Sequence, residues 1–464
     1  MGYLKNIGAG IIYIGVILAV LAFAPGLPPD ANFTEYNIVS PKELTGFLAL
    51  NDRLNNPEIL FKGKLHGPEA FASYNGELYT GVHGGYIVKI KENDEFIPIA
   101  KFGKQCEGDW QEHICGRPLG LKFNKNGELF VADAYYGIFK LDVTTGKYEK
   151  IVDIKKPIDG KAPNIVNSLD VASNGDIYWT DSSSEFALHD GVYTILADPN
   201  GRLLRYNAKT KKNEVLVKDL GFANGVFLSE DESFVLAIET LTSRVTKYNL
   251  KGPKAGKQEI FIEGLPGLPD NVHSDGQGGI LLSLFSYADA ENPALFQSLT
   301  PHPNIRRVIV RFMYILEAPL KLLQTYYPNY YTEKIIHSIG HFASVSFLGT
   351  KYSTILRLDT NGKIIDVAYG TDGKLSSISS AFVFKDHLWL GSPMNDFAAR
   401  VPLKQAFPSL ATSPKKTGTV KTANSIPEEP KKAEKQTTKD APKAKSEKPS
   451  GIDAKVQKEA KTIS

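Results

Sequence analysis

Oxygen-bearing side chains recur at one position of a repeated sequence unit, two residues before the first apolar residue of each copy. In chain order that position holds Glu69, Leu119, Asn167, Asn224, Asp270 and Ser380. Asn271, next to Asp270, could add another oxygen. Carboxylates and carboxamides without His or Cys suit a hard cation, with calcium favoured over magnesium. The pattern predicts a calcium site whose ligands are Glu69, Asn167, Asn224, Asp270 and Asn271.

A cation at such a site could support hydrolysis. It can polarise a carbonyl or phosphoryl oxygen and lower the pKa of a bound water, and a nearby carboxylate can serve as general base. Asp270 and Glu69 are the candidates for that catalytic role, while Asp133 and Asp181 are more remote and favour a structural role. The alternative for any single residue is local, because Asn and Asp also favour strand ends, where they bond nearby backbone.

The repeated unit shows which elements must position these residues. It consists of an apolar run, a turn with Gly or Asp, and an alternating strand that ends in a small or acidic residue. Its copies are Phe71–Gly81, Leu121–Asp133, Leu169–Asp181, Val226–Glu239, Val272–Ser283 and Phe382–Gly391. Each is followed by a third strand with an apolar-x-basic rhythm and by room for a fourth. This pattern is typical of propeller blades. We therefore predict an all-β, six-bladed propeller over residues 61–403, whose first strands line the axis.

The interval between the fifth and sixth copies is about 110 residues, longer than the others. The excess, about residues 287–341, has helical periodicity. One helical face carries Ile305, Val308, Ile309, Phe312, Met313 and Leu316. Pro319 should kink or end that helix. The sequence predicts a helical insertion that either packs on the propeller's side or forms a lid over the channel mouth that also touches the bilayer.

The N-terminal segment predicts a membrane anchor. Residues 7–24 are almost entirely apolar, which suits a membrane-spanning helix. A cleaved signal peptide is the alternative, although Pro25 should hinder cleavage after Ala24. Lys5 precedes the span and Asp30 follows it, so the positive-inside rule leaves residues 1–6 cytoplasmic. We expect a single-pass type II protein of the secretory pathway, in the endoplasmic reticulum or plasma membrane, with residues 25–60 as a linker and first outer strand and the propeller lumenal or extracellular.

Other features agree with an oxidising compartment and exclude nucleic acid as a partner. Asn32 begins a glycosylation triplet, and Cys106 and Cys115 could close a small disulfide loop, with free buried thiols as the alternative. The first 410 residues hold 41 basic and 44 acidic side chains, which is no nucleic-acid footprint. Residues 404–464 are rich in Lys, Pro, Ser, Thr and Ala, and predict a disordered tail.

Several longer motifs resemble a known family. They are Cys115–Gly120, Ala132–Gly137, Thr180–Ser183, Gly201–Tyr206, Phe222–Gly225 and Leu265–Asn271. Together they resemble strictosidine synthase-like propellers and, with the N-terminal anchor, are most similar to the adipocyte plasma membrane-associated protein group. The resemblance implies a six-bladed fold shared with calcium-dependent arylesterases, lactonases and phosphotriesterases. It also implies calcium ligands at Glu69, Asn167, Asn224 and Asp270.

Two departures from the wider group limit the expected chemistry. Leu119 stands where paraoxonases carry a catalytic His, and the segment Ser380–Phe384 lacks the catalytic Glu of plant strictosidine synthases. We therefore expect a calcium-dependent hydrolase of small esters or lactones, of arylesterase type, and not a true strictosidine synthase. The alternative is a non-catalytic membrane ectodomain for partner binding or adhesion, in which calcium is structural.

Overall fold

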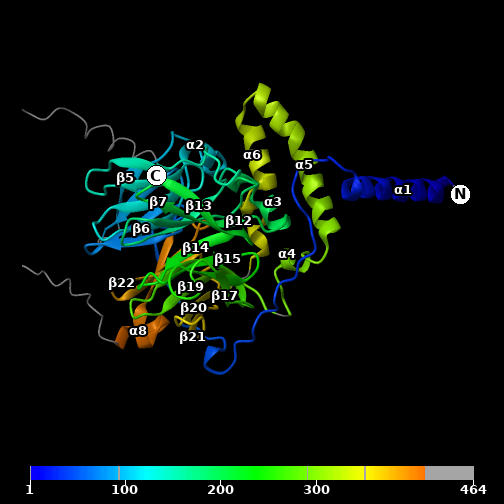
Figure 1. Cartoon of the computed structure of the whole chain (residues 1–464). Coiled ribbons are helices and arrows are strands. Elements are labelled where there is room, and N and C mark those ends of the chain that lie inside the picture. The colour runs from blue at the N-terminus through cyan, green and yellow to red at the C-terminus, as the bar shows by residue number, and fades with distance from the viewer. Residues whose placement is uncertain (1, 92–94, 290, 350–351, 413–464) are drawn as a thin grey trace, which may run out of the picture. The chain divides into compact units, whose positions relative to one another are not determined.

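The computed structural model describes residues 2–91, 95–289, 291–349 and 352–412 (Figure 1). Its strands form six four-stranded antiparallel sheets, the blades. Blades one and two are β2 (Phe71–Tyr74), β3 (Glu77–Val82), β4 (Tyr86–Ile90), β5 (Phe96–Lys101) and β6 (Pro118–Phe123), β7 (Leu129–Asp133), β8 (Gly137–Leu141), β9 (Tyr148–Val152). Blades three and four are β10 (Val166–Val171), β11 (Ile177–Asp181), β12 (Gly201–Asn207), β13 (Lys212–Leu220) and β14 (Ala223–Leu228), β15 (Phe234–Glu239), β16 (Arg244–Asn249), β17 (Gln258–Ile262). Blades five and six are β18 (Gly267–Ser274), β19 (Ile280–Tyr287), β20 (Ser353–Leu358), β21 (Ile364–Gly370) and β22 (Ser380–Phe384), β23 (His387–Gly391), β24 (Ala398–Pro402), β1 (Glu58–Leu60).

The first strands of the blades contact one another in a closed ring, in the order β2, β6, β10, β14, β18, β22 and back to β2. This ring confirms the predicted six-bladed propeller. The N-terminal strand β1 closes it by pairing with β24, where Ile59 lies opposite Ala399. Apolar clusters fill the space between blades, as where the Phe102 ring stacks on Phe139 at 4.3 Å.

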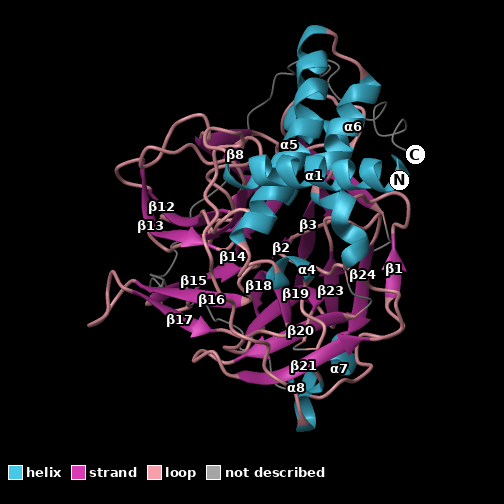
Figure 2. Cartoon of the chain, turned by 90° about the vertical axis from the view of Figure 1, so that its right-hand side faces the viewer, coloured by secondary structure: helices cyan, strands magenta, loops and turns pink. Residues whose placement is uncertain are grey.

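The helical insertion joins β19 to β20 inside blade five, at about the residues predicted for it. It contains α4 (Leu295–Ser298), α5 (Pro303–Tyr326), α6 (Tyr330–Gly340) and the 3-10 helix η4 (Phe342–Leu348). Figure 2 shows α5 and α6 side by side in front of the blades. Helix α5 continues through Pro319 instead of ending there, because proline removes one backbone donor and leaves the rest of the ladder in place.

The two ends of the described chain are helical. Helix α1 (Gly2–Phe23) is long and apolar enough to cross a membrane, by its length and composition. At the other end, α7 (Leu403–Ala406) and α8 (Pro408–Thr412) bury Phe407 and Leu410 in the core of blades five and six. The predicted tail boundary at 404 is therefore too early, since these apolar side chains recur at helical spacing. The rest of the predicted disordered tail, 413–464, lies outside the described residues.

The connection from β5 to β6 carries the disulfide. Cys106 and Cys115 are bonded, which confirms the predicted pairing. The loop contains the 3-10 helix η2 (Asp109–Gln111) and α2 (Glu112–Cys115), and it crosses from the outer edge of blade one to the axial strand of blade two. Asn32 is exposed, and its glycosylation stays a prediction.

Candidate functional site

The four aligned oxygen donors, here called the axial slot (Glu69, Asn167, Asn224 and Asp270), lie at one end of the ring of first strands. In blades three, four and five the strand ladder is interrupted there. The pairing skips from Val166 to Leu169, from Ala223 to Val226 and from Pro269 to Val272. A bulge of this kind releases residues from the ladder and re-aims their side chains. Asn167, Asn224 and Asp270 are among the residues released.

Side-chain contacts bring the slot residues of different blades together. Asn224 and Glu69 lie close enough to the Asp270 carboxyl to shift its pKa, Glu69 upwards and Asn224 downwards. Asn271 donates to Asp270 Oδ1 at 3.3 Å and lies close enough to Glu69 to lower its pKa. Blades one, four and five therefore meet at one place, as the aligned positions predict. Asn167 is linked to this group through the Ser182 hydroxyl, which also bonds the backbone next to Asn224.

Two hydroxyl side chains fix the orientation of the slot amides. Ser182 Oγ donates to the Ala223 carbonyl at 2.8 Å, so it can only accept from Asn167 Nδ2, at 3.0 Å. Thr240 Oγ1 likewise donates to a carbonyl of the next blade and accepts from Asn224 Nδ2 at 3.2 Å. Each amide oxygen is thereby turned away from its hydroxyl. Sequence reasoning missed both hydroxyl residues, although each directly follows the acidic residue that ends its repeat.

The oxygens left over in the slot are buried and have no hydrogen-bond partner. They are Glu69 Oε2, Asn167 Oδ1 and Asn224 Oδ1. A buried polar atom without a partner carries the cost of its lost hydration. In the described part of the chain, no group of three or more His, Cys, Asp or Glu could hold a metal ion. The slot differs from such groups because half of its donors are amides, and this oxygen set fits calcium.

Burial and mutual repulsion disfavour the charged carboxylates in the absence of a cation. Burial raises the pKa of Glu69 to about 7, with the Glu112 charge adding to the rise and the Arg117 charge opposing it. Burial and then the charge of Glu69 raise the pKa of Asp270 well above its ordinary value. Two buried carboxyl groups with raised pKa values would release protons if a cation bound between them.

Calcium binding should therefore depend on pH and release protons. Since the pKa of Glu69 is about 7, calcium must displace its proton at lower pH, and affinity should fall by about tenfold for each pH unit below 7. Calorimetric titrations in buffers of different ionisation enthalpy would measure the protons released. Affinity that stays constant from pH 8 to pH 5 would contradict this account.

Arg117, immediately before β6, is the charged neighbour of Glu69. Its guanidinium lies 3.7 Å from Glu69 Oε2 and 3.1 Å from Glu112 Oε1. It also donates to the Gly67 carbonyl at 3.0 Å and reaches that of Pro393 at 3.5 Å. Arg117 thus ties blades one, two and six together beside the slot.

The disulfide loop supplies Glu112, the second carboxylate of this cluster. Its Oε1 lies 2.9 Å from His83 Nδ1, and its Oε2 lies 3.9 Å from His341 Nε2, at the end of α6. Burial raises the pKa of Glu112, but the neighbouring His83, Arg117 and His341 outweigh it and lower that pKa to about 2. His83 Nε2 faces the Pro393 carbonyl at 3.1 Å. Both ring nitrogens of His83 therefore face oxygen atoms.

The remaining aligned positions have other roles. Leu119 is buried in an apolar cluster. Ser380 Oγ lies 2.9 Å from His273 Nε2, a hydroxyl and imidazole pair that sequence reasoning missed because His273 stands outside the aligned position. The more remote Asp133 and Asp181 have structural partners. Asp133 accepts the backbone N–H groups of the following turn, and Asp181 pairs with Arg202 at 2.6 Å.

The insertion covers the face of the propeller that holds the slot. Strand β19 ends with Tyr287 opposite Gly267, which is the slot end of β18. From there the chain brings Phe342 of η4 against Phe222, with ring centroids 5.5 Å apart. Leu119 joins the same cluster, and the slot side chains are only 3–5% exposed. Of the two placements predicted for the insertion, the lid over this mouth agrees with these contacts.

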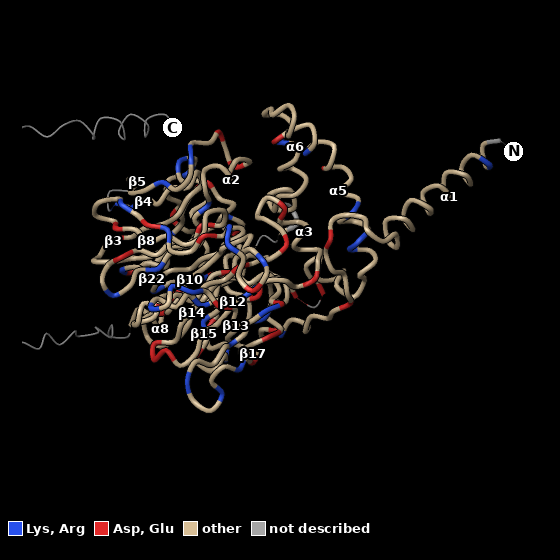
Figure 3. Tube along the Cα trace, turned by 45° about the horizontal axis from the view of Figure 1, so that its top comes forward, with Lys and Arg blue, Asp and Glu red and all other residues tan. Residues whose placement is uncertain are grey.

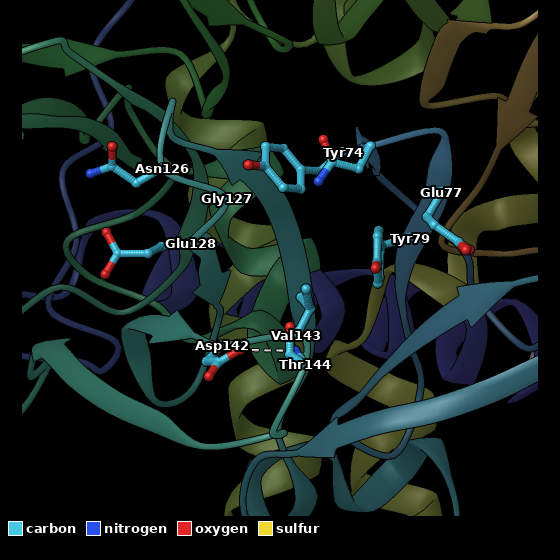
Figure 4. Close-up of a pocket in the computed structure, with 10 residues that line it drawn as sticks. Tyr74, Glu77, Tyr79, Asn126, Gly127, Glu128, Asp142, Val143 and Thr144 are labelled. Atoms are coloured by element: carbon cyan, nitrogen blue, oxygen red, sulfur yellow. Dashed lines mark hydrogen bonds between the residues drawn. The ribbon is translucent and has the colours of Figure 1, made fainter. Parts of the chain in front are cut away.

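A pocket of about 390 Å³ between blades one and two lies elsewhere (Figure 4). Its lining includes Tyr74, the last residue of β2, whereas Glu69 lies before the first residue of that strand. The lining also includes Asp142, whose Oδ1 accepts the Thr144 N–H at 2.8 Å. The pocket is therefore separate from the axial slot.

Comparison with known proteins shows the family of this chain. The family model described as strictosidine synthase matches residues 167–253, and the model of the strictosidine synthase-like N-terminal region matches residues 46–90. The adipocyte plasma membrane-associated protein Hemomucin of Drosophila melanogaster is 40% identical over 413 residues, 88% of this chain and 71% of the relative. The chain belongs to the adipocyte plasma membrane-associated protein family.

A second member of this family, the adipocyte plasma membrane-associated protein of Homo sapiens, is 32% identical over 83% of this chain and 86% of its own length. Among solved structures, a gluconolactonase of Xanthomonas campestris matches 82% of this chain and 99% of its own, with 14% identity and a TM-score of 0.47. The family match agrees with the resemblance carried by the sequence motifs.

Proposed function

We propose that the protein is a membrane-anchored, calcium-dependent hydrolase of small esters or lactones. The observation that carries this proposal is the convergence of unpartnered, buried slot oxygens with two carboxyl groups of raised pKa. Glu69, Asn167, Asn224 and Asp270 would hold the ion, with Asn271 beside them. Helix α1 would serve as a type II anchor in the plasma membrane or endoplasmic reticulum, with the propeller on the lumenal or extracellular side.

When bound, calcium would supply Lewis-acid polarisation of a substrate carbonyl. The protein's own side chains would supply the general base, hold it in place and exclude water. Glu69 is a candidate general base that would take a proton from water through a carboxylate oxygen not bound to the ion. Asp270 is the other candidate base. Arg117, 3.7 Å from Glu69, holds that carboxylate in place. The apolar cluster of Leu119, Phe222 and Phe342 would exclude water and favour apolar substrates.

The second candidate function is a non-catalytic ectodomain with a structural calcium ion. The near-complete burial of the slot favours it, because a caged ion has no position open to substrate. Activity therefore requires the insertion to move away from the slot.

Hydrolysis assays distinguish these functions. The full chain, purified in detergent, should hydrolyse phenyl acetate or simple lactones, and a calcium chelator should abolish the activity. Asn224→Ala should abolish it too, whereas Asp133→Asn, a buried change outside the slot, should not. Calcium binding without hydrolysis would support the structural role. Hydrolysis that resists the chelator but is lost in Ser380→Ala would instead assign it to the Ser380 and His273 pair.

A further inference from the structure

The buried side of α5 carries two charged residues among apolar ones, and its exposed side is largely apolar. Arg306, Val310 and Glu317 are fully buried. The large apolar residues of α5 that are 44–60% exposed are Ile305, Phe312, Ile315, Leu316, Leu322 and Leu323. At 100° per residue the two sets lie on opposite sides of the helix. A helix that faces water has the reverse arrangement.

Specific polar contacts hold α5 in this orientation. Arg306 donates to the Leu196 carbonyl at 2.9 Å and pairs with Asp198 at 3.2 Å. Glu317 accepts a hydrogen bond from the Tyr193 hydroxyl at 2.7 Å. Turning the apolar side inward would break these bonds and leave Asp198 without its cationic partner and the Tyr193 hydroxyl without its acceptor, which is costly. The apolar side therefore stays outside.

The exposed apolar surface continues past the end of α5. Tyr326, Tyr327, Tyr330, Tyr331 and Ile335 are 42–76% exposed. Together with the six exposed residues of α5 they form what is here called the outer hairpin face. Outside α1, 12 of the 20 exposed large apolar residues in the described chain lie between 295 and 335. Such a concentration marks an interaction surface, since single exposed apolar residues are otherwise scattered.

Helix α1 ends against α5. Arg311 donates to the carbonyls of Leu21 and Ala24 at 2.8 and 3.0 Å, and Arg307 donates to that of Ala22 at 3.0 Å. These guanidinium groups satisfy carbonyls that a helix C-terminus leaves open. Figure 3 shows α1 without charged residues beyond its N-terminal end. If α1 spans a bilayer, the surface of that bilayer therefore lies beside α5.

We propose that the outer hairpin face docks on the lipid bilayer that α1 spans. Leu, Ile and Phe side chains would enter the boundary between head groups and acyl chains, with the tyrosines at the interface. Arg307 and Arg311 would lie at the level of the phosphates. The junction of α1 and α5 favours lipid over a protein partner, because it brings the apolar face to the membrane surface without a second molecule. Since η4 also packs near the axial slot, docking would turn that mouth of the propeller towards the membrane.

Lipid-quenching fluorescence on the full chain tests this proposal. Both native cysteines are in the disulfide, so Leu316→Cys or Tyr327→Cys would carry a single environment-sensitive fluorophore. Ile260→Cys, at a residue 46% exposed on the outer strand of blade four, is the matched control. In phosphatidylcholine vesicles, doxyl-labelled lipid should quench the probes at 316 and 327 and leave the probe at 260 unchanged. Aqueous iodide should quench the probe at 260 and leave the probes at 316 and 327 unchanged.

Two results would overturn the proposal. Strong iodide quenching at 316 and 327 without lipid quenching would show that the face is in water. Protection from both quenchers would show that a protein covers it, and energy transfer between labelled copies would identify that protein as a second chain. Melting temperatures of the labelled variants that match that of the unmodified chain would confirm that each probe reports on the folded protein.

Discussion

Replacing Asp270 with asparagine should weaken calcium binding and at the same time stabilise the metal-free protein. Loss of an outer-shell partner of a metal typically costs about 10–100-fold in affinity, so loss of a charged ligand should cost at least about 100-fold. The folded-state pKa of Asp270 is raised by burial and by Glu69. Its ionisation therefore destabilises the metal-free fold as pH rises above the unfolded value of about 4. Asparagine does not ionise, so the variant keeps the stability that the unmodified protein loses as pH rises.

The two effects have opposite signs, which separates a metal site from a merely structural carboxylate. Melting temperatures at pH 8 with and without calcium would measure both. Asp133→Asn is the matched control, since Asp133 is also a fully buried carboxyl group whose pKa burial raises to about 7. The control should keep the calcium-induced rise in melting temperature. Asp270→Asn that retains this rise would exclude Asp270 as a ligand.

Replacing Arg117 with methionine should lower the free energy of unfolding by about 3–5 kcal/mol, the usual cost of breaking a buried ion pair. The Arg117 side chain is 2% exposed and lies between Glu112 and Glu69. Its loss leaves the buried Glu69 without a cationic partner, removes one of the partners of Glu112, and removes the bonds to Gly67 and Pro393. Urea unfolding, followed by tryptophan fluorescence, would measure the change.

Lys140→Met gives a matched control on the outside of blade two. Lys140 also pairs with two carboxylates, Glu128 and Glu149, but its side chain is 31% exposed. Exposed pairs contribute about 0–1 kcal/mol, so the control should unfold close to the unmodified protein. Adding Glu112→Gln to the Arg117 variant should recover part of the loss, or part of the yield if the single variant does not fold. Equal stability of the Arg117 and Lys140 variants would contradict this assignment.

The propeller could be predicted because its signals are local and repeated. Alternation and turn dipeptides recur in each copy, and aligning the copies placed Glu69, Asn167, Asn224 and Asp270 at one position. The bulges that turn these side chains out of the ladder have no local sequence signal, because they depend on packing between blades. The partners Ser182 and Arg117 were missed for the same reason, since each contacts the slot from a different blade or strand.

The orientation of α5 could not be predicted from the sequence, which left two placements of the insertion open. Its apolar spacing indicated a helix, but a soluble protein would turn that side to its core. Here Arg306 and Glu317 face the propeller because Arg306 pairs with Asp198 and Glu317 accepts a hydrogen bond from Tyr193. Periodicity alone cannot distinguish a core from a bilayer, and only the partners of the polar residues decide which side is buried.

Calorimetric titration of calcium into the metal-free full chain tests the central claim most directly. The axial slot predicts one ion per chain at pH 8, bound with a rise in melting temperature and with both effects lost in Asp270→Asn. Absence of saturable binding, or equal binding by the unmodified chain and the variant, would contradict an axial calcium site.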